Sequence, residues 1–240
     1  MTTKVALFGA RGRMGKAITR LAPEYGAEIA ASIDRGEGDL GSLAQSGARV
    51  LIDFSSAPSV ADVARACADA NVALVSGTTG LDEAGKRALD DASKKIAVLW
   101  EPNMSVGVLV LGEIVRRAIA MLGASFDVEI VETHHKMKAD APSGTAMRLA
   151  EIAREARKGP LVTGREGKPG ARTADEIGVL AVRGGDVVGD HTVHLLGAGE
   201  RLELTHRATS RDVFAIGALR AAVALAGKPA GRYALRDVVL

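Results

Sequence analysis

The chain of 240 residues predicts an α/β protein that joins a parallel sheet covered by helices to a second region with a mixed or antiparallel sheet. In residues 1–104, short runs rich in Val and Ile alternate with longer amphipathic segments, which is typical of βαβ units. These runs are too continuously apolar for a sheet with one face in water, and this favours a parallel sheet buried on both faces. In residues 105–210, three strand-like runs follow one another, and the third alternates, with Leu202 and Leu204 on one face.

The first region has a clear signal for each of its elements. Its apolar runs predict strands at residues 4–9, 27–33, 49–55, 72–77 and 95–100. The amphipathic segments between them predict helices at residues 12–25, 58–70 and 81–95. Strands and helices therefore alternate through the whole region.

The second region breaks this alternation. Helices are expected at residues 105–122 and 143–158, the latter capped by Ser143, with a strand at 126–135 between them and a polar Gly/Pro/Arg loop after them. Further strands are expected at residues 176–183, 187–196 and 200–208. A last helix at residues 211–226, capped by Ser210, and a short strand near 237–240 are expected to end the chain.

Composition excludes several classes of partner. Lys and Arg total 31 against 29 acidic residues, and the aromatic residues are one Trp, two Tyr and four Phe, so neither a basic patch nor a stacking platform for nucleic acid is expected. No apolar run reaches the roughly 18 residues of a membrane span, and no signal segment follows Met1, which predicts a cytoplasmic protein. The single cysteine, Cys67, cannot form an intrachain disulfide and is expected to be a small buried residue.

A glycine-rich loop follows the first strand. In GARGRMG, three glycines are spaced so that the chain can turn tightly and approach a pyrophosphate at the amino end of the next helix. Asp34 ends the second strand, where a carboxylate commonly accepts the ribose hydroxyls of a dinucleotide, and Arg35 could pair with a 2′-phosphate. The loop therefore predicts NADH or NADPH binding, and the alternative is a tight turn without a ligand.

Two further loops are expected at the carboxyl edge of the parallel sheet, where ligands bind in such folds. They are GTTG at residues 77–80 and EPNMS at residues 101–105. The alternative for the first loop is that it only caps the next helix. Asp53 and the serines beside it could likewise be no more than caps at the end of a strand.

The stretch ETHHKMKADAPSGTA, residues 132–146, concentrates titratable side chains before a helix. Consecutive residues of a strand point to opposite faces, so His134 and His135 are not expected to enter one cleft together, and His134 is a credible proton donor or acceptor. The helix start at Gly144 and Thr145 could hold a substrate carboxylate, with Lys138 or His135 supplying charge. A metal site is the competing hypothesis, but adjacent histidines lack the i, i+4 spacing of a helical zinc pair. The remaining alternative is a solvated basic loop.

This motif, E-x-H-H-x-x-K-x-D-A-P-S-G-T-A, resembles that of the 4-hydroxy-tetrahydrodipicolinate reductase (dihydrodipicolinate reductase) family, and it is complete here. The resemblance extends along the chain through VALFGARGRMG, SGTTG, PNMSVGV, GDVVGDHTV and THRATSRDVFAIGA. It departs at EPNMS, where relatives often read A-x-N-F-S, and between Asp34 and Asp53, where the chain is short and a helix is expected to be reduced or absent.

The resemblance implies a role for each part of the chain. A Rossmann domain at residues 1–104, completed by 211–240, would bind NADH or NADPH, and an inserted α+β domain at 105–210 would bind a small dicarboxylate substrate and form a homotetramer. The enzyme would reduce 4-hydroxy-tetrahydrodipicolinate, by way of dihydrodipicolinate, in the diaminopimelate route to lysine. The alternatives are another NAD(P)-dependent amino-acid-pathway dehydrogenase and a non-catalytic dinucleotide-sensing protein.

The resemblance also implies the site residues. His134 would donate and accept the proton with Lys138 as a second donor, and no metal is expected. The substrate contacts would be His135, Gly144 and Thr145. The cofactor contacts would be Gly9, Ala10, Arg11, Gly12, Arg13, Met14, Asp34, Arg35, Gly77, Thr78, Thr79, Glu101, Pro102, Asn103, Met104 and Arg211.

Overall fold

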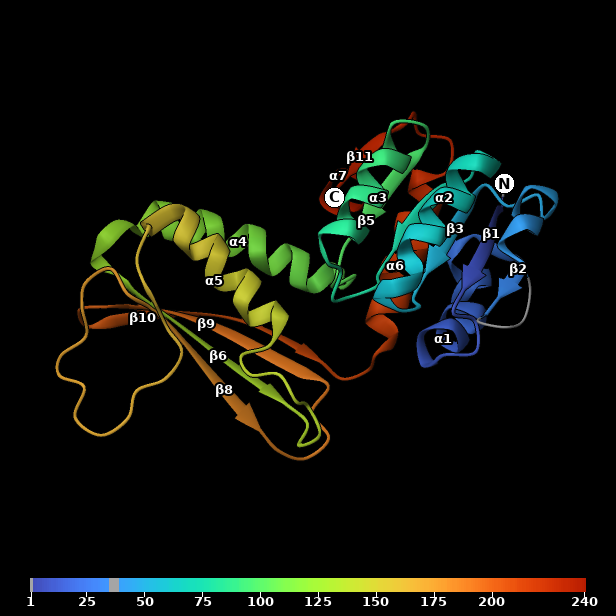
Figure 1. Cartoon of the computed structure of the whole chain (residues 1–240). Coiled ribbons are helices and arrows are strands. Elements are labelled where there is room, and N and C mark those ends of the chain that lie inside the picture. The colour runs from blue at the N-terminus through green and yellow to red at the C-terminus, as the bar shows by residue number, and fades with distance from the viewer. Residues whose placement is uncertain (1, 35–38) are drawn as a thin grey trace. The chain divides into compact units, whose positions relative to one another are not determined.

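The computed structural model describes residues 2–34 and 39–240, which divide into two compact units. Unit 1 comprises Met1–Val106 and Arg211–Leu240, and unit 2 comprises Gly107–Ser210. Unit 2 is therefore continuous in sequence, whereas unit 1 is interrupted by it. Figure 1 shows the course of the chain through both units.

Unit 1 is built on a parallel sheet of six strands in the order β11-β5-β4-β3-β1-β2. The strands are β1 (Thr3–Phe8), β2 (Ala27–Ile33), β3 (Val50–Asp53), β4 (Ala73–Ser76), β5 (Ala97–Trp100) and β11 (Gly231–Tyr233). The central strands β3 and β4 are buried at every position, as their continuous apolar runs predict.

Helices cover both faces of this sheet. They are α1 (Arg13–Leu21), α2 (Val60–Ala70), α3 (Glu83–Ser93), α6 (Asp212–Leu225) and α7 (Arg236–Val239). Helices α2 and α3 lie side by side and share one apolar core with the sheet, which includes the fully buried Cys67. Helix α6 packs against α1 and against β3, β4 and β5 (Figure 1).

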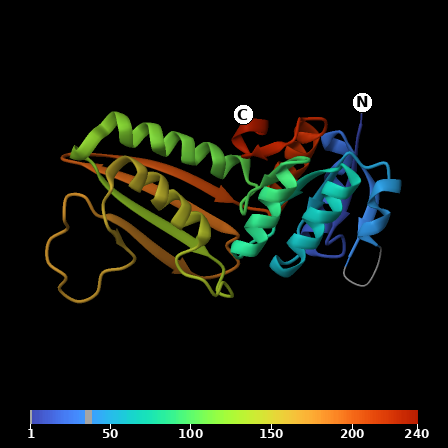
Figure 2. The same cartoon turned by 45° about the horizontal axis from the view of Figure 1, so that its top comes forward.

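Unit 2 is a mixed sheet of five strands in the order β10-β9-β6-β8-β7, covered on one face by two helices (Figure 2). The strands are β6 (Asp127–His134), β7 (Leu161–Val162), β8 (Ile177–Arg183), β9 (Gly189–Gly197) and β10 (Glu200–Ala208), and the helices are α4 (Val106–Leu122) and α5 (Gly144–Arg157). Strand β6 runs parallel to β8 and antiparallel to β9. Its side chains alternate strictly between buried and partly exposed, so one face meets the helices.

The predicted fold class is confirmed, and the strands and helices differ from the prediction only in detail. The polar loop after α5 contains the two-residue strand β7, which is too short to leave a pattern in the sequence. Between Asp34 and Asp53, the described residues form a 3-10 helix, Leu40–Gln45, in place of an α-helix. Among the described residues, no helix has the length and the apolar character needed to cross a membrane.

Two predictions about the end of the chain are wrong. The terminal strand is Gly231–Tyr233, and the apolar run expected as a strand at residues 237–240 lies in the short helix α7 instead. The Asp237 carboxylate accepts the Ala234 N–H at 2.8 Å, which favours a turn over an extended chain. The N-cap of α6 is Arg211 rather than Ser210, and the Arg211 carbonyl accepts the Phe214 N–H at 3.1 Å.

Candidate functional site

The glycine loop of unit 1 leaves no room for side chains at two of its positions. Gly9 has a φ of +85°, and a Cβ there would lie 2.6 Å from the Phe54 carbonyl oxygen. A Cβ on Gly15 would lie 2.3 Å from the Ala10 carbonyl oxygen, so the first turn of α1 packs directly on the loop. Gly12 is the N-cap of α1, and the first turn that follows carries no acidic side chain. This bare helix start fits an anionic group such as a pyrophosphate.

Asp34 lies beside this loop, although 23 residues separate it from Arg11 in the sequence. Its Oδ2 atom accepts the backbone N–H of Arg11 at 2.8 Å. The carboxylate is therefore fixed at the same edge of the sheet as the glycine loop, which is where a ribose hydroxyl would need an acceptor. Arg35, the second residue expected to select the cofactor, lies outside the described residues.

A buried carboxylate connects the loops after β3 and β4. Asp53 is fully buried, and its Oδ1 accepts from the Ser55 hydroxyl at 2.6 Å and from the Ser55 N–H at 3.0 Å. Its Oδ2 accepts from the hydroxyls of Ser76 at 2.7 Å and Thr78 at 2.9 Å. The Asp53 side chain is thus more than a strand-end cap, since it joins two neighbouring strand ends. The capping interpretation of the Gly77 loop is also wrong, because Asp82 is the N-cap of α3 and accepts the Gly85 N–H at 2.8 Å.

The end of β5 is bonded to the Gly77 loop, and the loop after β5 packs into the core of unit 1. The Trp100 indole N–H donates to the Thr78 carbonyl oxygen at 2.8 Å. The Met104 side chain is fully buried, and a Cβ on Gly217 of α6 would lie 1.7 Å from the Met104 carbonyl oxygen. Met104 could therefore offer a cofactor only its backbone. Arg211, the remaining residue expected to contact the cofactor, is exposed at the start of α6.

In unit 2, four nitrogen atoms from the described part of the chain converge on the fully buried carboxylate of Glu132. The Nδ1 atom of His134 lies 2.5 Å from Oε2, and the backbone N–H of Ser143 donates to Oε1 at 2.9 Å. The guanidinium of Arg183 donates to both oxygens at 2.8 Å each. Burial alone would raise the pKa of Glu132, but the bonds from Arg183, His134 and Ser143 together hold that pKa below its ordinary value.

His191 forms the other wall of this cluster. Its ring meets that of His134 edge to face at a centroid distance of 5.2 Å, and its Nε2 lies 3.3 Å from the Ser143 hydroxyl oxygen. Burial lowers the pKa of His191 to about 4, with repulsion from His134 as the second cause, so His191 is neutral at pH 7. Its Nδ1 is buried and has no hydrogen-bond partner among the described residues.

The amino end of α5 lies next to the Glu132 cluster. Ser143 is the N-cap, as predicted, and its hydroxyl accepts the Ala146 N–H at 3.2 Å. A Cβ on Gly144 would meet none of the described atoms within 4 Å, so the space in front of the first turn is open. Thr145, the next residue, is partly exposed. The geometry suits a carboxylate ligand.

Two of the basic residues of the motif, His135 and Lys138, were expected at the substrate and lie in the loop between β6 and α5. His135 follows the last residue of β6, and its N–H donates to the Val187 carbonyl oxygen at 2.8 Å. The ammonium of Lys138 pairs with the Asp140 carboxylate at 2.8 Å, and this hydrogen bond is the main cause that lowers the pKa of Asp140. His134 lies in β6 and is only 8% exposed, so it is not part of a solvated loop, whereas Lys136, Met137 and Asp140 after it are exposed. Within residues 2–34 and 39–240, no three His, Cys, Asp or Glu side chains are placed to hold a metal ion together.

Sequence reasoning missed three members of the Glu132 cluster. Glu132 lies in the motif without an expected role there, and Arg183 and His191 lie outside the motif. Register places them together, because His134 pairs with Arg183 of β8 and Glu132 pairs with His191 of β9. A usable signal was present in GDHTVHL, where His191 occupies an alternating position shared with buried Val193 and Leu195.

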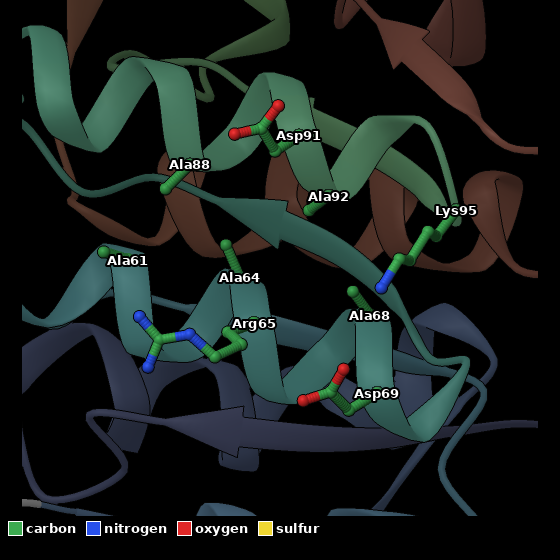
Figure 3. A pocket seen from close by; sticks show the side chains of 9 residues that line it. All are labelled: Ala61, Ala64, Arg65, Ala68, Asp69, Ala88, Asp91, Ala92 and Lys95. Carbon is green, nitrogen blue, oxygen red and sulfur yellow. The ribbon is translucent and has the colours of Figure 1, made fainter.

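A groove of about 240 Å³ lies elsewhere in unit 1, between α2 and α3 (Figure 3). Its walls are alanine methyl groups and its rim is charged. The lining residues are Ala61, Ala64, Arg65, Ala68, Asp69, Ala88, Asp91, Ala92 and Lys95. None of the residues expected to bind cofactor or substrate belongs to it, so the predicted site is separate from this groove.

Two family models together match almost the whole chain. The model of the dihydrodipicolinate reductase N-terminus matches residues 3–104, and that of the C-terminus matches residues 107–239. A 4-hydroxy-tetrahydrodipicolinate reductase of Anaeromyxobacter dehalogenans is 47% identical over an alignment 263 residues long. The alignment covers 99% of this chain and 97% of that protein. One from Myxococcus xanthus is 51% identical over 195 residues, which cover 80% of this chain and 72% of that protein.

Solved structures agree with this at the level of the fold. A dipicolinate-bound dihydrodipicolinate reductase from Paenisporosarcina sp. TG-14 has a TM-score of 0.81 at 23% identity and covers the whole of both chains. A probable dehydrogenase from Thermotoga maritima has a TM-score of 0.62 at 12% identity, with 98% of this chain and 92% of that chain covered. The similarity in fold therefore extends to a protein of only 12% identity.

Proposed function

Because the chain belongs to the dihydrodipicolinate reductase family, we propose that it reduces 4-hydroxy-tetrahydrodipicolinate, by way of dihydrodipicolinate, to tetrahydrodipicolinate with NADH or NADPH. This reaction is a step of the diaminopimelate route to lysine. The observation that carries the proposal is the position of His134, whose buried imidazole lies within one hydrogen-bonded cluster with the amino end of α5. This arrangement supports a proton donor next to a carboxylate site in unit 2.

The described residues of unit 1 fit a dinucleotide. The bare helix start after Gly12 would hold the pyrophosphate through backbone N–H groups, and Asp34 would accept from a ribose hydroxyl. The Gly77 and Glu101 loops would line the nicotinamide side, with Thr78 held in place by Asp53. When bound, NADH or NADPH supplies the hydride. Asp34 favours a bare ribose and Arg35 a ribose phosphate, so we propose that both coenzymes are used.

Unit 2 would bind the substrate and handle its proton. The N–H groups of Gly144 and Thr145 would hold one carboxylate, with His135 beside them. Reduction adds a hydride at ring C4, after the 4-hydroxyl has left as water, and a proton completes it. His134 would donate that proton, and Lys138 would act as a second donor.

The test is an NAD(P)H oxidation assay with freshly made substrate, run on the wild type and on His134→Gln. We expect oxidation with either coenzyme in the wild type and a fall in turnover of roughly 100- to 10,000-fold in the variant. The dissociation constant of the dinucleotide should not change, since His134 belongs to unit 2 and the glycine loop to unit 1. An unchanged turnover would refute the role of His134. Lack of oxidation with both coenzymes would favour a dinucleotide sensor.

We also propose that the chain forms a homotetramer in the cytoplasm through the sheet of unit 2. The face of that sheet opposite α4 and α5 includes Val182, which is 48% exposed. Analytical ultracentrifugation should give four times the mass of one chain. A Val182→Lys variant should shift the mass towards that of smaller species, and a wild type that sediments as a monomer would contradict the proposal.

A further inference from the structure

We infer that Glu132 is a positioning residue for the reduction: it fixes His134 as the tautomer that carries hydrogen on Nδ1, so that Nε2 exchanges the proton with the substrate. Through the Ser143 N–H, the same carboxylate fastens this imidazole to the amino end of α5. The inference rests on the proposed function, which makes His134 the proton donor.

The tautomer follows from the hydrogen-bonding inventory around Glu132. The Ser143 N–H and two guanidinium N–H groups of Arg183 can only donate, so both oxygens of Glu132 act as acceptors. A carboxyl proton would point at one of these donors, and the carboxylate is therefore ionised. His134 Nδ1, at 2.5 Å from Oε2, must then supply the hydrogen.

The carboxylate is held from two sides and cannot rotate without losing partners. Oε2 accepts from His134 and from one Nη of Arg183, whereas Oε1 accepts from Ser143 and from the other Nη. Arg183 also donates to the Asp140 carbonyl oxygen at 2.6 Å, in the loop that carries Lys138. The bidentate guanidinium compensates the buried charge, so Glu132 can stay ionised without exposure to water.

Gly189 lies beside the Nε2 edge of the His134 ring and carries no side chain there. A Cβ on Gly189 would lie 3.0 Å from Nε2 of His134, so a larger residue would press on the reacting nitrogen. Among the described residues, His134 contacts Glu132 on its own strand and His191 on β9, and Arg183 on β8 is its partner in strand register. His191 is neutral at pH 7, so it adds no charge beside the His134 ring.

The first experiment needs no change to the cluster. Nitrogen-15 NMR of the histidine side chains in the full wild-type chain distinguishes the two tautomers, and His134→Gln assigns the signal among the five histidines. We expect neutral His134 to carry its hydrogen on Nδ1. A spectrum in which the hydrogen sits on Nε2 overturns the inference, whatever the activity.

The second experiment compares Glu132→Gln with Glu176→Gln in the assay described above. The control carboxylate also accepts from an arginine and a backbone N–H, those of Arg165 and Thr173, but it contacts neither His134 nor Ser143. For Glu132→Gln we expect turnover to fall roughly 10- to 100-fold. The alkaline limb of the kcat profile should also move to lower pH, because a neutral amide no longer stabilises the protonated imidazole. Glu176→Gln should keep both the turnover and the pH profile.

The outcomes separate the inference from the function on which it rests. If His134→Gln keeps full turnover, the proton-donor role itself is wrong. If His134→Gln loses turnover while Glu132→Gln keeps its kcat and its pH profile, the function stands and the positioning role is wrong. If Glu132→Gln does not fold, the tautomer of His134 in the wild-type NMR spectrum still tests the inference.

Discussion

Each unit of the molecule buries one carboxylate completely near the end of a strand, Asp53 in unit 1 and Glu132 in unit 2. Each carboxylate accepts hydrogen bonds from segments that lie far apart in the sequence. Their partners differ in kind, however. Asp53 accepts from three hydroxyl groups and one N–H, whereas Glu132 accepts from four N–H groups, two of them on a cation.

This difference in partners decides how each site responds when its carboxylate is replaced by another side chain. A hydroxyl group can rotate and accept instead of donating, so the partners of Asp53 can adapt to a new side chain. Backbone and guanidinium N–H groups can only donate, so Ser143 and Arg183 tolerate only an acceptor at Glu132. The first arrangement is a scaffold for loops, and the second also fixes the state of a titratable side chain.

The strongest test of this comparison is the same isosteric change in both units. In Glu132→Gln, an NH₂ group must face at least one N–H donor, and we expect the free energy of unfolding to fall by about 3 to 5 kcal/mol. In Asp53→Asn, the NH₂ group can donate to Ser76 and Thr78, and we expect a loss of only about 1 kcal/mol. Urea unfolding at pH 7 measures both, and equal losses would break the comparison.

The pH dependence of stability gives the next largest effect, and it belongs to unit 2. Since burial lowers the pKa of His191 to about 4 from 6.5, the unfolded chain binds this proton first. The stabilisation is therefore complete above pH 6.5 and is lost as the pH falls towards 4. Between pH 7 and 5, this amounts to about 2 kcal/mol.

His191→Gln should reduce this decline in urea unfolding measured at pH 7, 6 and 5. Part of the decline should remain, because burial also lowers the pKa of His206. Glu132 contributes to the loss of stability only at lower pH. A carboxyl group with a lowered pKa costs stability only as the pH falls below the ordinary 4.5. A decline as steep as that of the wild type would show that His191 is not the titrating group.

Gly15→Ala tests the scaffold side of the comparison. The new Cβ would lie 2.3 Å from the Ala10 carbonyl oxygen and 2.4 Å from that of Gly9, so the loop must move. We expect a loss of about 1.5 kcal/mol in stability and weaker dinucleotide binding by calorimetry. Gly26→Ala is a poor control because its φ is +70°, whereas Gly184→Ala meets no described atom within 4 Å and should leave binding unchanged. Tight dinucleotide binding by Gly15→Ala would contradict the role of the loop.

The smallest expected effect comes from removing one helix cap in each unit. Ser143→Ala and Asp82→Ala each remove a side-chain cap and should each cost about 1 kcal/mol in unfolding free energy. Only Ser143→Ala should also lower turnover, because its hydroxyl touches His191 at the cluster. Its backbone N–H still reaches Glu132, so the loss of turnover should be smaller than in Glu132→Gln. A larger loss would shift the positioning role from Glu132 to the cap.

The sequence predicts the fold well where a local pattern decides the structure. Continuous apolar runs indicate the parallel strands of unit 1, and Ser143 before Gly144 indicates the cap of α5. It fails where a local pattern is ambiguous, as in the apolar end of the chain, which forms α7 once Asp237 accepts a turn N–H. The site follows the same rule. His134 is conspicuous in its motif, but Arg183 joins it only through strand register, which a local pattern does not contain.

The interruption of unit 1 by unit 2 has a consequence for synthesis on the ribosome. Unit 2 is one continuous stretch, so it can complete its sheet as soon as Ala208 has left the exit tunnel. Unit 1 begins first but finishes last, because helix α6 and the edge strand β11 come after Arg211. Until they emerge, β5 lacks its β11 neighbour, and β3 and β4 lack the cover of α6. Unit 1 thus starts to be translated before unit 2 but needs residues 211–240, which follow unit 2, to complete its sheet and its helical cover.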